Sequence, residues 1–149
     1  MHKFLNLAIN EVKTHKFERI LQCNLCAVIV GGGSVLSTGF NKTSRNSFVQ
    51  YLSDFDLSGK PFINTHAEVD AILKVRNKID LTGCKIYVAR YKQGQKQVGM
   101  ARPCATCEIV LRRYGISRAY YTIDENHYGV MNVSNNTDKI VREQCTCLV

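Results

Sequence analysis

The sequence lacks any long hydrophobic run: none of its 149 residues belongs to a stretch near the roughly 18 apolar residues of a membrane-spanning helix. The first residues, Met1 to Asn6, lack the apolar segment and small-residue cleavage site of a secretory signal. Internal repeats, low-complexity tracts and linker-like segments are lacking too. We therefore expect one soluble domain over residues 1–149, with no membrane partner and no export.

The cysteine pattern also fits a disulfide framework badly. The seven cysteines are an odd number, and two of them are spaced like a metal-binding pair. This usage fits a reducing compartment, so we expect the protein in the cytoplasm. The hydrophobic fraction of 45% is enough for an ordinary core. The formal charge of +8 attracts anions, and both nucleotides and nucleic acids satisfy that condition.

Hydrophobic periodicity predicts an alternation of helices and strands. The expected helices are 4–21 (with room for a break near Thr14), 65–77 with Thr65 as its cap, one from Pro103 to Gly115, and a short one at 138–145. The expected strands are 27–30 and 34–40, joined as a hairpin through Gly31–Gly33, then 84–91, 118–123 and an antiparallel 128–133. Residues 92–101 are expected to form a solvent-facing loop. The natural packing is α/β, a three-layer α/β/α arrangement in which helices flank a central mixed β-sheet.

Two short motifs carry the chemistry: Thr65-His66-Ala67-Glu68 and Pro103-Cys104-Ala105-Thr106-Cys107. One imidazole and two thiolates form the ligand set of a catalytic zinc that keeps its fourth position open for water. Glu68 is close enough in sequence to reach that water without being a ligand. The combination H-x-E with P-C-x-x-C is the signature of zinc-dependent nucleobase deaminases.

Both motifs fall at predicted helix starts. Cys104 and Cys107 at i and i+3 share one helical face, so both sulfurs can point at one ion. The positive end of the helix dipole favours their thiolates. With His66 opening the other helix, two helix N-termini would converge on one Zn²⁺ per chain, which would lower the pKa of its bound water towards neutrality.

The remaining cysteines allow other arrangements. Cys23 and Cys26 would complete a four-thiolate zinc knuckle with Cys104 and Cys107, but this leaves His66 and Glu68 unexplained. A second, structural zinc site could instead join residues Cys23, Cys26, Cys145 and Cys147. We favour incidental free thiols for these four, and a core position for Cys84.

On these motifs the sequence resembles the cytidine deaminase superfamily, and most closely its deoxycytidylate (dCMP) deaminase branch with related phage and viral enzymes. The matching segments are Ala27–Val30 with its hairpin, Ser37–Asn41, His66–Ile72 and Pro103–Cys107. The resemblance implies a cytidine-deaminase-like fold, a small-molecule nucleotide substrate and self-association into a homo-oligomer. It would place a viral member in the host cytoplasm.

The resemblance also implies roles. His66, Cys104 and Cys107 would bind zinc, and Glu68 would shuttle protons to the cytosine ring nitrogen and then to the departing amine. Asn41 would contact the sugar or base, and the backbone N–H of Ala67 would hold the pyrimidine carbonyl oxygen.

The sequence departs from the family after the asparagine. Asn41-Lys42-Thr43-Ser44-Arg45 stands where dCMP enzymes carry a glycine and a proline-containing loop. Lys42 and Arg45 flank the expected sugar contact, and we take them as candidates for gripping a 5′-phosphate.

The function that this pattern favours is hydrolytic deamination of dCMP to dUMP. The alternative is a polynucleotide deaminase acting on cytosine or adenine in RNA or single-stranded DNA, which the basic charge and the aromatic residues Phe48, Tyr51 and Phe55 would suit. A catalytically silent zinc-stabilised binding module is a third reading, which the presence of Glu68 disfavours.

Overall fold

The computed structural model describes residues 2–18, 23–43 and 64–143. The proposed phosphate contact Arg45, the aromatic residues Phe48, Tyr51 and Phe55, and the cysteines Cys145 and Cys147 lie outside these ranges. Within them, no helix is long and apolar enough to cross a membrane.

In the described part of the chain, seven strands form one mixed sheet in the order β2-β1-β3-β5-β6-β7, and β4 pairs with the end of β3. The strands are β1 (Asn24–Gly31), β2 (Ser34–Phe40), β3 (Lys85–Lys92), β4 (Gln97–Gly99), β5 (Arg118–Thr122), β6 (His127–Asn132) and β7 (Thr137–Arg142). The pairing of β3 with β5 is parallel, and the other pairings are antiparallel.

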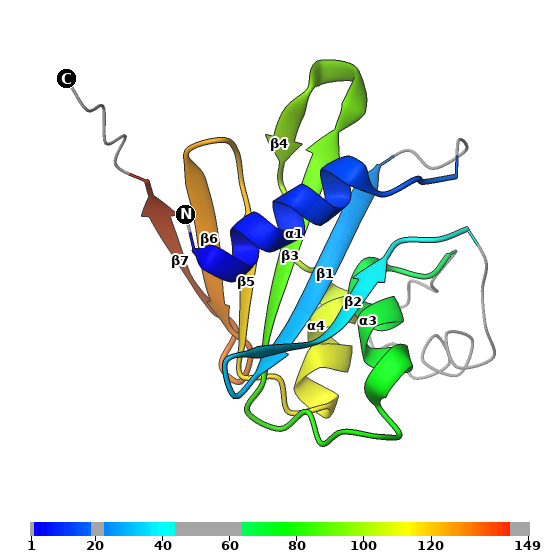
Figure 1. The fold of residues 1–149 in the computed structure, drawn as a ribbon. Helices are drawn as coiled ribbons and strands as arrows, with labels where there is room; N and C mark the ends of the chain where they lie inside the picture. The colour runs from blue at the N-terminus through cyan, green and yellow to red at the C-terminus, as the bar shows by residue number, and fades with distance from the viewer. Residues whose placement is uncertain (1, 19–22, 44–63, 144–149) are drawn as a thin grey trace.

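Helices cover both faces of this sheet (Figure 1). Helix α1 (Lys3–Thr14) packs on one face, and α3 (Ala67–Val75) and α4 (Ala105–Arg113) pack on the other. The side chains of β3 point alternately to the two faces of the sheet, so this strand contributes to both hydrophobic cores. Tyr87 and Ala89 belong to the core beside α1, whereas Ile86 and Val88 belong to the core beside α3 and α4. The predicted three-layer α/β/α fold is confirmed.

Several local predictions are confirmed as well. Helix α1 ends at Thr14, where the break was expected. The predicted continuation of the helix is wrong over residues 15–18, which are not helical, and residues 19–21 lie outside the described ranges. Gly32 and Gly33 have φ of 58° and 78°, the left-handed values that a tight two-residue hairpin turn needs. The predicted fifth strand is β6, and it is antiparallel to β5. Helices α3 and α4 begin slightly later than expected, because their N-caps are His66 and Cys104.

Two other predictions are wrong. Residues 92–101 are not a simple loop, since Gln93–Gln95 form a 3-10 turn and β4 returns antiparallel to the end of β3. Residues 138–145 are not a helix over the part described, because Thr137–Arg142 form β7 against β6. The turn before β7 places Asn136 at φ 54°, and the β-branched residues of β7 suit a strand. Backbone pairing with the edge of β6 therefore determines the conformation of residues 137–142, and the weak helical periodicity does not.

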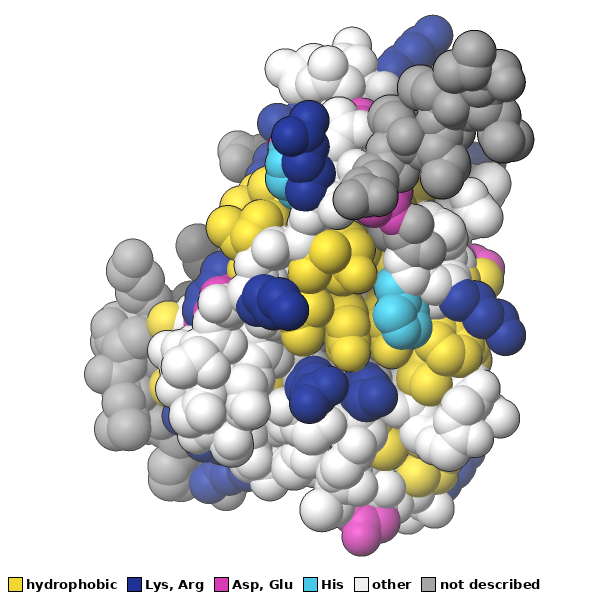
Figure 2. All heavy atoms as spheres, turned by 90° about the vertical axis from the view of Figure 1, so that its left-hand side faces the viewer, with side chains coloured by type: hydrophobic (Ala, Val, Ile, Leu, Met, Phe, Trp, Pro, Cys, Tyr) yellow, Lys and Arg dark blue, Asp and Glu magenta, His cyan; other side chains and the backbone are white. Residues whose placement is uncertain are grey.

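At the β7 edge the layers leave apolar surface uncovered. Figure 2 shows this side of the molecule, with hydrophobic side chains gathered at its centre and Lys and Arg side chains around them. On the α1 face of this edge, Tyr128 and Val130 of β6 are only partly buried. On the opposite face, Ile140 of β7, which pairs with Gly129, is 67% exposed. Helix α1 packs over β1, β3 and β5, so it leaves this edge open (Figure 1).

The start of α3 is pressed against β2 at Gly39. A Cβ on this residue would lie 2.3 Å from the backbone nitrogen of Ala71 and 2.4 Å from the carbonyl oxygen of Ala67. Nearby, the Ser37 hydroxyl donates to the Ala71 carbonyl at 2.7 Å. Only glycine permits this approach, which sets the depth at which the first turn of α3 sits.

Gly39→Ala should therefore destabilise the protein, because the added methyl meets backbone that cannot rotate away. We expect a loss of about 3 kcal/mol in the free energy of unfolding, at the upper end for overpacking, measured by urea denaturation. Gly94→Ala is the matched control, since a Cβ there has no atom within 4 Å. Equal stability of the two variants would contradict the close packing of α3 on β2.

Candidate metal centre and active-site pocket

The topology brings the first turns of α3 and α4 to one edge of the sheet. Strands β2 and β3 both run antiparallel to β1, so they point the same way. Helix α3 follows β2, and α4 follows β3 before the chain enters β5, which is parallel to β3. Both helices therefore begin beyond the same ends of the strands, where loops and helix N-termini meet.

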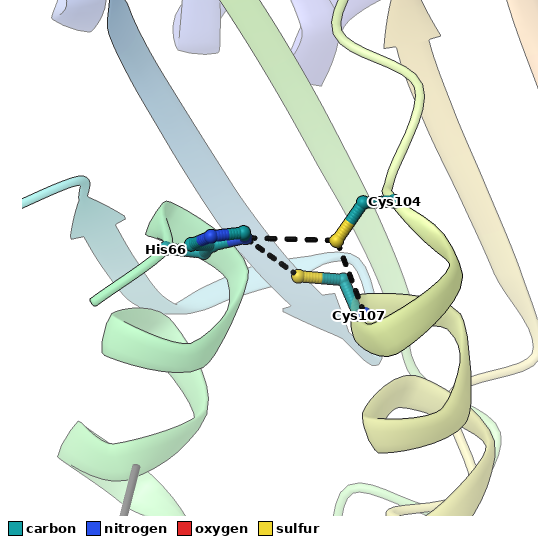
Figure 3. Close-up of side chains that lie close together, drawn as sticks. All are labelled: His66, Cys104 and Cys107. Atoms are coloured by element: carbon teal, nitrogen blue, oxygen red, sulfur yellow. Dashed lines mark hydrogen bonds between the residues drawn. The ribbon is translucent and has the colours of Figure 1, made fainter. Parts of the chain in front are cut away.

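His66, Cys104 and Cys107 converge at this edge from the two helix starts (Figure 3). The His66 Nδ1 atom lies 3.6 Å from the Cys104 Sγ and 3.3 Å from the Cys107 Sγ. One ligand atom from each of the three residues falls within 4.8 Å of the other two. The Cys107 amide also donates to the Cys104 sulfur at 3.4 Å, which makes Cys104 the N-cap of α4. The residues paired by sequence spacing are thus brought together in space.

Glu68 lies against this cluster. Its side chain is buried in the first turn of α3, and its Oε2 accepts a hydrogen bond from the Cys107 thiol at 2.9 Å. Burial raises the pKa of the Glu68 carboxyl, against the opposing effects of the Cys107 hydrogen bond and the nearby His66. A raised pKa makes a carboxylate a better proton acceptor, which suits a group that takes up and then releases a proton.

The two thiols differ in charge. The hydrogen bond from Cys107, together with those from His66 and the Cys107 amide, lowers the pKa of Cys104 to about 4 against the effect of partial burial. The hydrogen bond to Cys104, burial and the Glu68 charge raise the pKa of Cys107 well above its ordinary value. Although burial opposes it, the Cys104 hydrogen bond and the Glu68 charge raise the pKa of His66. Protons on Cys107 and His66 therefore compensate the negative charge of the Cys104 thiolate and of Glu68 beside it.

A zinc ion fits this donor set. One imidazole nitrogen and two sulfurs are the ligands that zinc prefers, and three protein ligands leave a position open. A cation would take over the charge compensation that protons supply among the protein groups alone, and it would stabilise both thiolates. Among the described residues, this is the group of His, Cys, Asp and Glu side chains with metal-binding geometry.

The other described cysteines stand apart from the cluster. Cys26 is fully buried in β1, and burial raises the pKa of its thiol to about 12, which disfavours the thiolate that a metal needs. Cys84 is buried in the core beside α3 and α4, as expected. Cys23 is partly exposed and does not join the three-residue group, so the four-thiolate knuckle is not formed.

The cluster opens into a pocket of about 250 Å³. Its walls come from β1, β3, the end of β2, the start of α3 and the segment before α4. The lining residues are Cys23, Leu25, Asn41, Asn64, His66, Ala67, Glu68, Arg90, Met100, Ala101, Arg102 and Cys104. This set includes the expected contacts Asn41 and Ala67. The first amides of α3 receive no side-chain cap from the N-cap residue, so they suit a ligand carbonyl.

Asn41 is fixed where β2 ends. Its Oδ1 accepts from the Leu25 amide at 2.8 Å, and its Nδ2 donates to the Cys23 carbonyl at 2.7 Å. The residue is buried, and these two bonds tie the end of β2 to the beginning of β1. Asn41 therefore shapes the pocket wall with a side chain that is already oriented.

Lys42 follows the same strand end but turns towards Asp70. Its Nζ lies 3.1 Å from the Asp70 Oδ1, and its backbone forms an antiparallel bridge with Thr65. Asp70 is buried and also bonds Lys74 and the Phe40 amide. Lys42 is not among the residues that line the pocket.

Arg102 anchors the segment that leads into Cys104. Its guanidinium donates to the two Asp138 oxygens at 2.9 and 3.0 Å, to the Asn136 side chain at 3.1 Å and to Glu108. These partners hold β7 and α4 to the metal-binding segment.

Sequence reasoning missed Arg90, Met100 and Arg102 as pocket residues. The sequence does contain a signal for Arg90. It is a charged residue on the side of β3 on which Ile86 and Val88 are buried. Met100 belongs to residues 92–101, for which the sequence predicts a solvent-facing loop and gives no sign of β4, and Arg102 directly follows them.

The family model for the cytidine and deoxycytidylate deaminase zinc-binding region matches residues 1–123. The chain belongs to this family. Its membership supports deaminase activity of the cytidine and deoxycytidylate type, and the His66, Cys104 and Cys107 cluster is consistent with the zinc-binding region for which the family is described. A comparison with curated protein sequences gives no match.

Solved structures show the same fold. The apo dCMP deaminase from cyanophage S-TIM5 is 21% identical with a TM-score of 0.53, over 80% of this chain and 79% of the phage chain. The same phage enzyme in complex with dCMP and dUMP is 19% identical with a TM-score of 0.52, over 79% and 76%. Cytidine deaminase from Burkholderia pseudomallei is 15% identical with a TM-score of 0.53, over 95% and 93%.

Metal analysis of variants tests the cluster directly. His66→Ala, Cys104→Ser and Cys107→Ser should each cut bound zinc, from about one ion per chain to well below half, because two protein ligands hold zinc weakly. Elemental analysis of the purified proteins measures this. Cys23→Ser is the matched control and should keep its zinc. Equal loss in the control would instead indicate a site that uses Cys23.

The Arg102–Asp138 contact predicts a pH-dependent contribution to stability. The Arg102 hydrogen bonds lower the pKa of Asp138 below its ordinary value, against a smaller effect of burial. The stabilisation is therefore present above the unfolded pKa and is lost as the pH falls through the folded one. Asp138→Asn should lower the free energy of unfolding by about 1–3 kcal/mol at pH 7. Denaturation from pH 7 to 3 should show that difference shrinking, and a constant difference would contradict it.

Proposed function

We propose that this protein is a zinc-dependent hydrolase that converts dCMP and water to dUMP and ammonia. The observation that carries the proposal is the His66, Cys104 and Cys107 cluster beside the buried Glu68, in a pocket that can admit a small molecule. The fold that it shares with the cyanophage dCMP deaminase supports the same substrate class.

Held by His66, Cys104 and Cys107, zinc would supply a water activated for attack at neutral pH. Glu68 accepts the proton that this water loses, because its carboxyl is buried next to the cluster and has a raised pKa. It then delivers that proton to the cytosine ring nitrogen beside the amine. The water oxygen adds to the ring carbon that carries the amine. Glu68 then takes the remaining proton of that oxygen and passes it to the amine nitrogen. The bond between carbon and nitrogen breaks, the ring carbon becomes a carbonyl, and ammonia leaves.

The pocket walls orient the nucleotide. The N–H of Ala67, at the start of α3, donates to the pyrimidine carbonyl oxygen. Asn41 contacts the sugar or the base from the end of β2. Lys42 and Arg45 remain our proposed phosphate contacts; Lys42 would have to share its charge with Asp70.

The proposal includes a homo-oligomer. The uncovered hydrophobic side chains at the β7 edge, with a basic surround, are the kind of surface that a second copy would cover (Figure 2). Sedimentation of the purified protein over a range of concentrations measures the assembly state.

Glu68→Gln tests the proton shuttle. The amide keeps the shape of the side chain but cannot take up a proton, so kcat should fall by about 10²–10⁴-fold. Zinc content should stay near one ion per chain, because Glu68 is not a ligand. Glu11→Gln, on α1 across the sheet, is the matched control and should keep full activity. Persistent turnover in the Glu68 variant would refute the assignment.

A substrate panel separates the candidate functions. Ammonia release is followed with cytosine, cytidine, deoxycytidine, CMP, dCMP, dCTP and short RNA and DNA oligonucleotides. We expect dCMP to be the best substrate. Preference for oligonucleotides, with binding that weakens steeply as salt rises, would replace our proposal with the polynucleotide deaminase. Bound zinc without any turnover would identify a silent binding module.

A further inference from the structure

A second cation faces the pocket besides Arg102. Arg90 lies near the end of β3, on the side of the strand that also carries Ile86 and Val88 and faces α3 and α4. In the sheet it sits between Leu25 of β1 and Gly99 of β4. It lines the same pocket as the metal cluster and Glu68.

The Arg90 guanidinium has no acidic partner among the described residues. Its Nε is buried and makes no hydrogen bond within that part of the chain. The other cations near the site are committed, because Arg102 is held by Asp138 and Glu108, and Lys42 by Asp70. Leaving a buried charged donor unpaired is costly, so a side chain in this state is poised for an external acceptor.

The backbone holds Arg90 in this position. Its amide donates to the Thr122 hydroxyl at 3.1 Å, and that hydroxyl donates to the Gly99 carbonyl at 2.7 Å. A Cβ on Gly99 would lie 3.4 Å from the Arg90 Cδ and 2.8 Å from the Lys92 Cε. The absence of a side chain at Gly99 thus lets two cationic side chains run along one face of the β3–β4 hairpin, next to the pocket.

We propose that Arg90 binds the 5′-phosphate of the substrate and makes the enzyme selective for a nucleoside monophosphate. This inference rests on the proposed function, which places the base at the His66 and Glu68 end of the pocket. The planar guanidinium can give two parallel hydrogen bonds to phosphate oxygens, and a neutral nucleoside has no group to accept them. The inference adds a phosphate contact inside the pocket to those proposed at Lys42 and Arg45.

Binding of the product isolates this role from catalysis. Calorimetry compares dUMP with deoxyuridine for the wild type and for Arg90→Gln. We expect the variant to lose about tenfold to hundredfold in affinity for dUMP, as for a charge-assisted hydrogen-bonded pair. Deoxyuridine binding should change far less, and Arg90→Lys should fall between, since it keeps the charge without the planar fork. Arg118→Gln, at the opposite end of the strands, is the matched control for the lost charge and should bind dUMP like the wild type.

Several outcomes would overturn the inference. Equal losses for dUMP and deoxyuridine would assign Arg90 a role in pocket shape, and unchanged dUMP affinity would remove it from the phosphate site. A loss confined to single-stranded oligonucleotides would assign it to a polynucleotide backbone. If Arg90→Gln does not fold, Arg90→Lys carries the same comparison. Turnover is measured separately, so a wild type that binds dUMP through Arg90 but does not release ammonia would refute only the proposed function.

Discussion

The site depends on two helices beginning at the same edge of the sheet. Since β2 and β3 point the same way, the helix that follows each strand starts beyond the same strand ends. The first turns of α3 and α4 therefore meet there with their positive dipole ends. This environment stabilises the Cys104 thiolate beside a buried carboxyl group. Residues 38 positions apart or more approach within a few ångströms there. Moving either helix by one turn would separate the imidazole from the sulfurs.

The site also depends on how closely α3 packs on β2. Gly39 lets the helix backbone touch β2, and Asp70 then gathers two lysines and a backbone amide of β2 around one buried carboxylate. These contacts hold the turn that carries His66 and Glu68 against a strand that ends beside Asn41. The close contact between α3 and β2 thus fixes the position of the metal cluster relative to the pocket wall at Asn41.

The metal cluster was predictable because each half is a short local motif with a fixed chemical meaning, and the two halves needed only the fold class to meet. The strands of the core were predictable for a similar reason, since buried side chains alternate between the two faces of β3. Strand β7 was not, because its state depends on the edge of β6 and on the partners of Asp138. Nor was the pairing of Lys42, whose charge is taken up by Asp70 from a distant helix. Long-range contacts decide such residues, and single-sequence patterns do not contain them.

Arg102 steadies the metal-binding segment through a partner that comes much later in the chain, since Asp138 follows it by 36 positions. A ribosome delivers residues in order, so both thiols of the cluster emerge before the β6–β7 hairpin can form. During synthesis these sulfurs are exposed while the arginine beside them still lacks its carboxylate. A nascent chain stalled before β7 would therefore carry both thiols on a segment that is not yet held in place, and completion of the last hairpin supplies the carboxylate that fixes it.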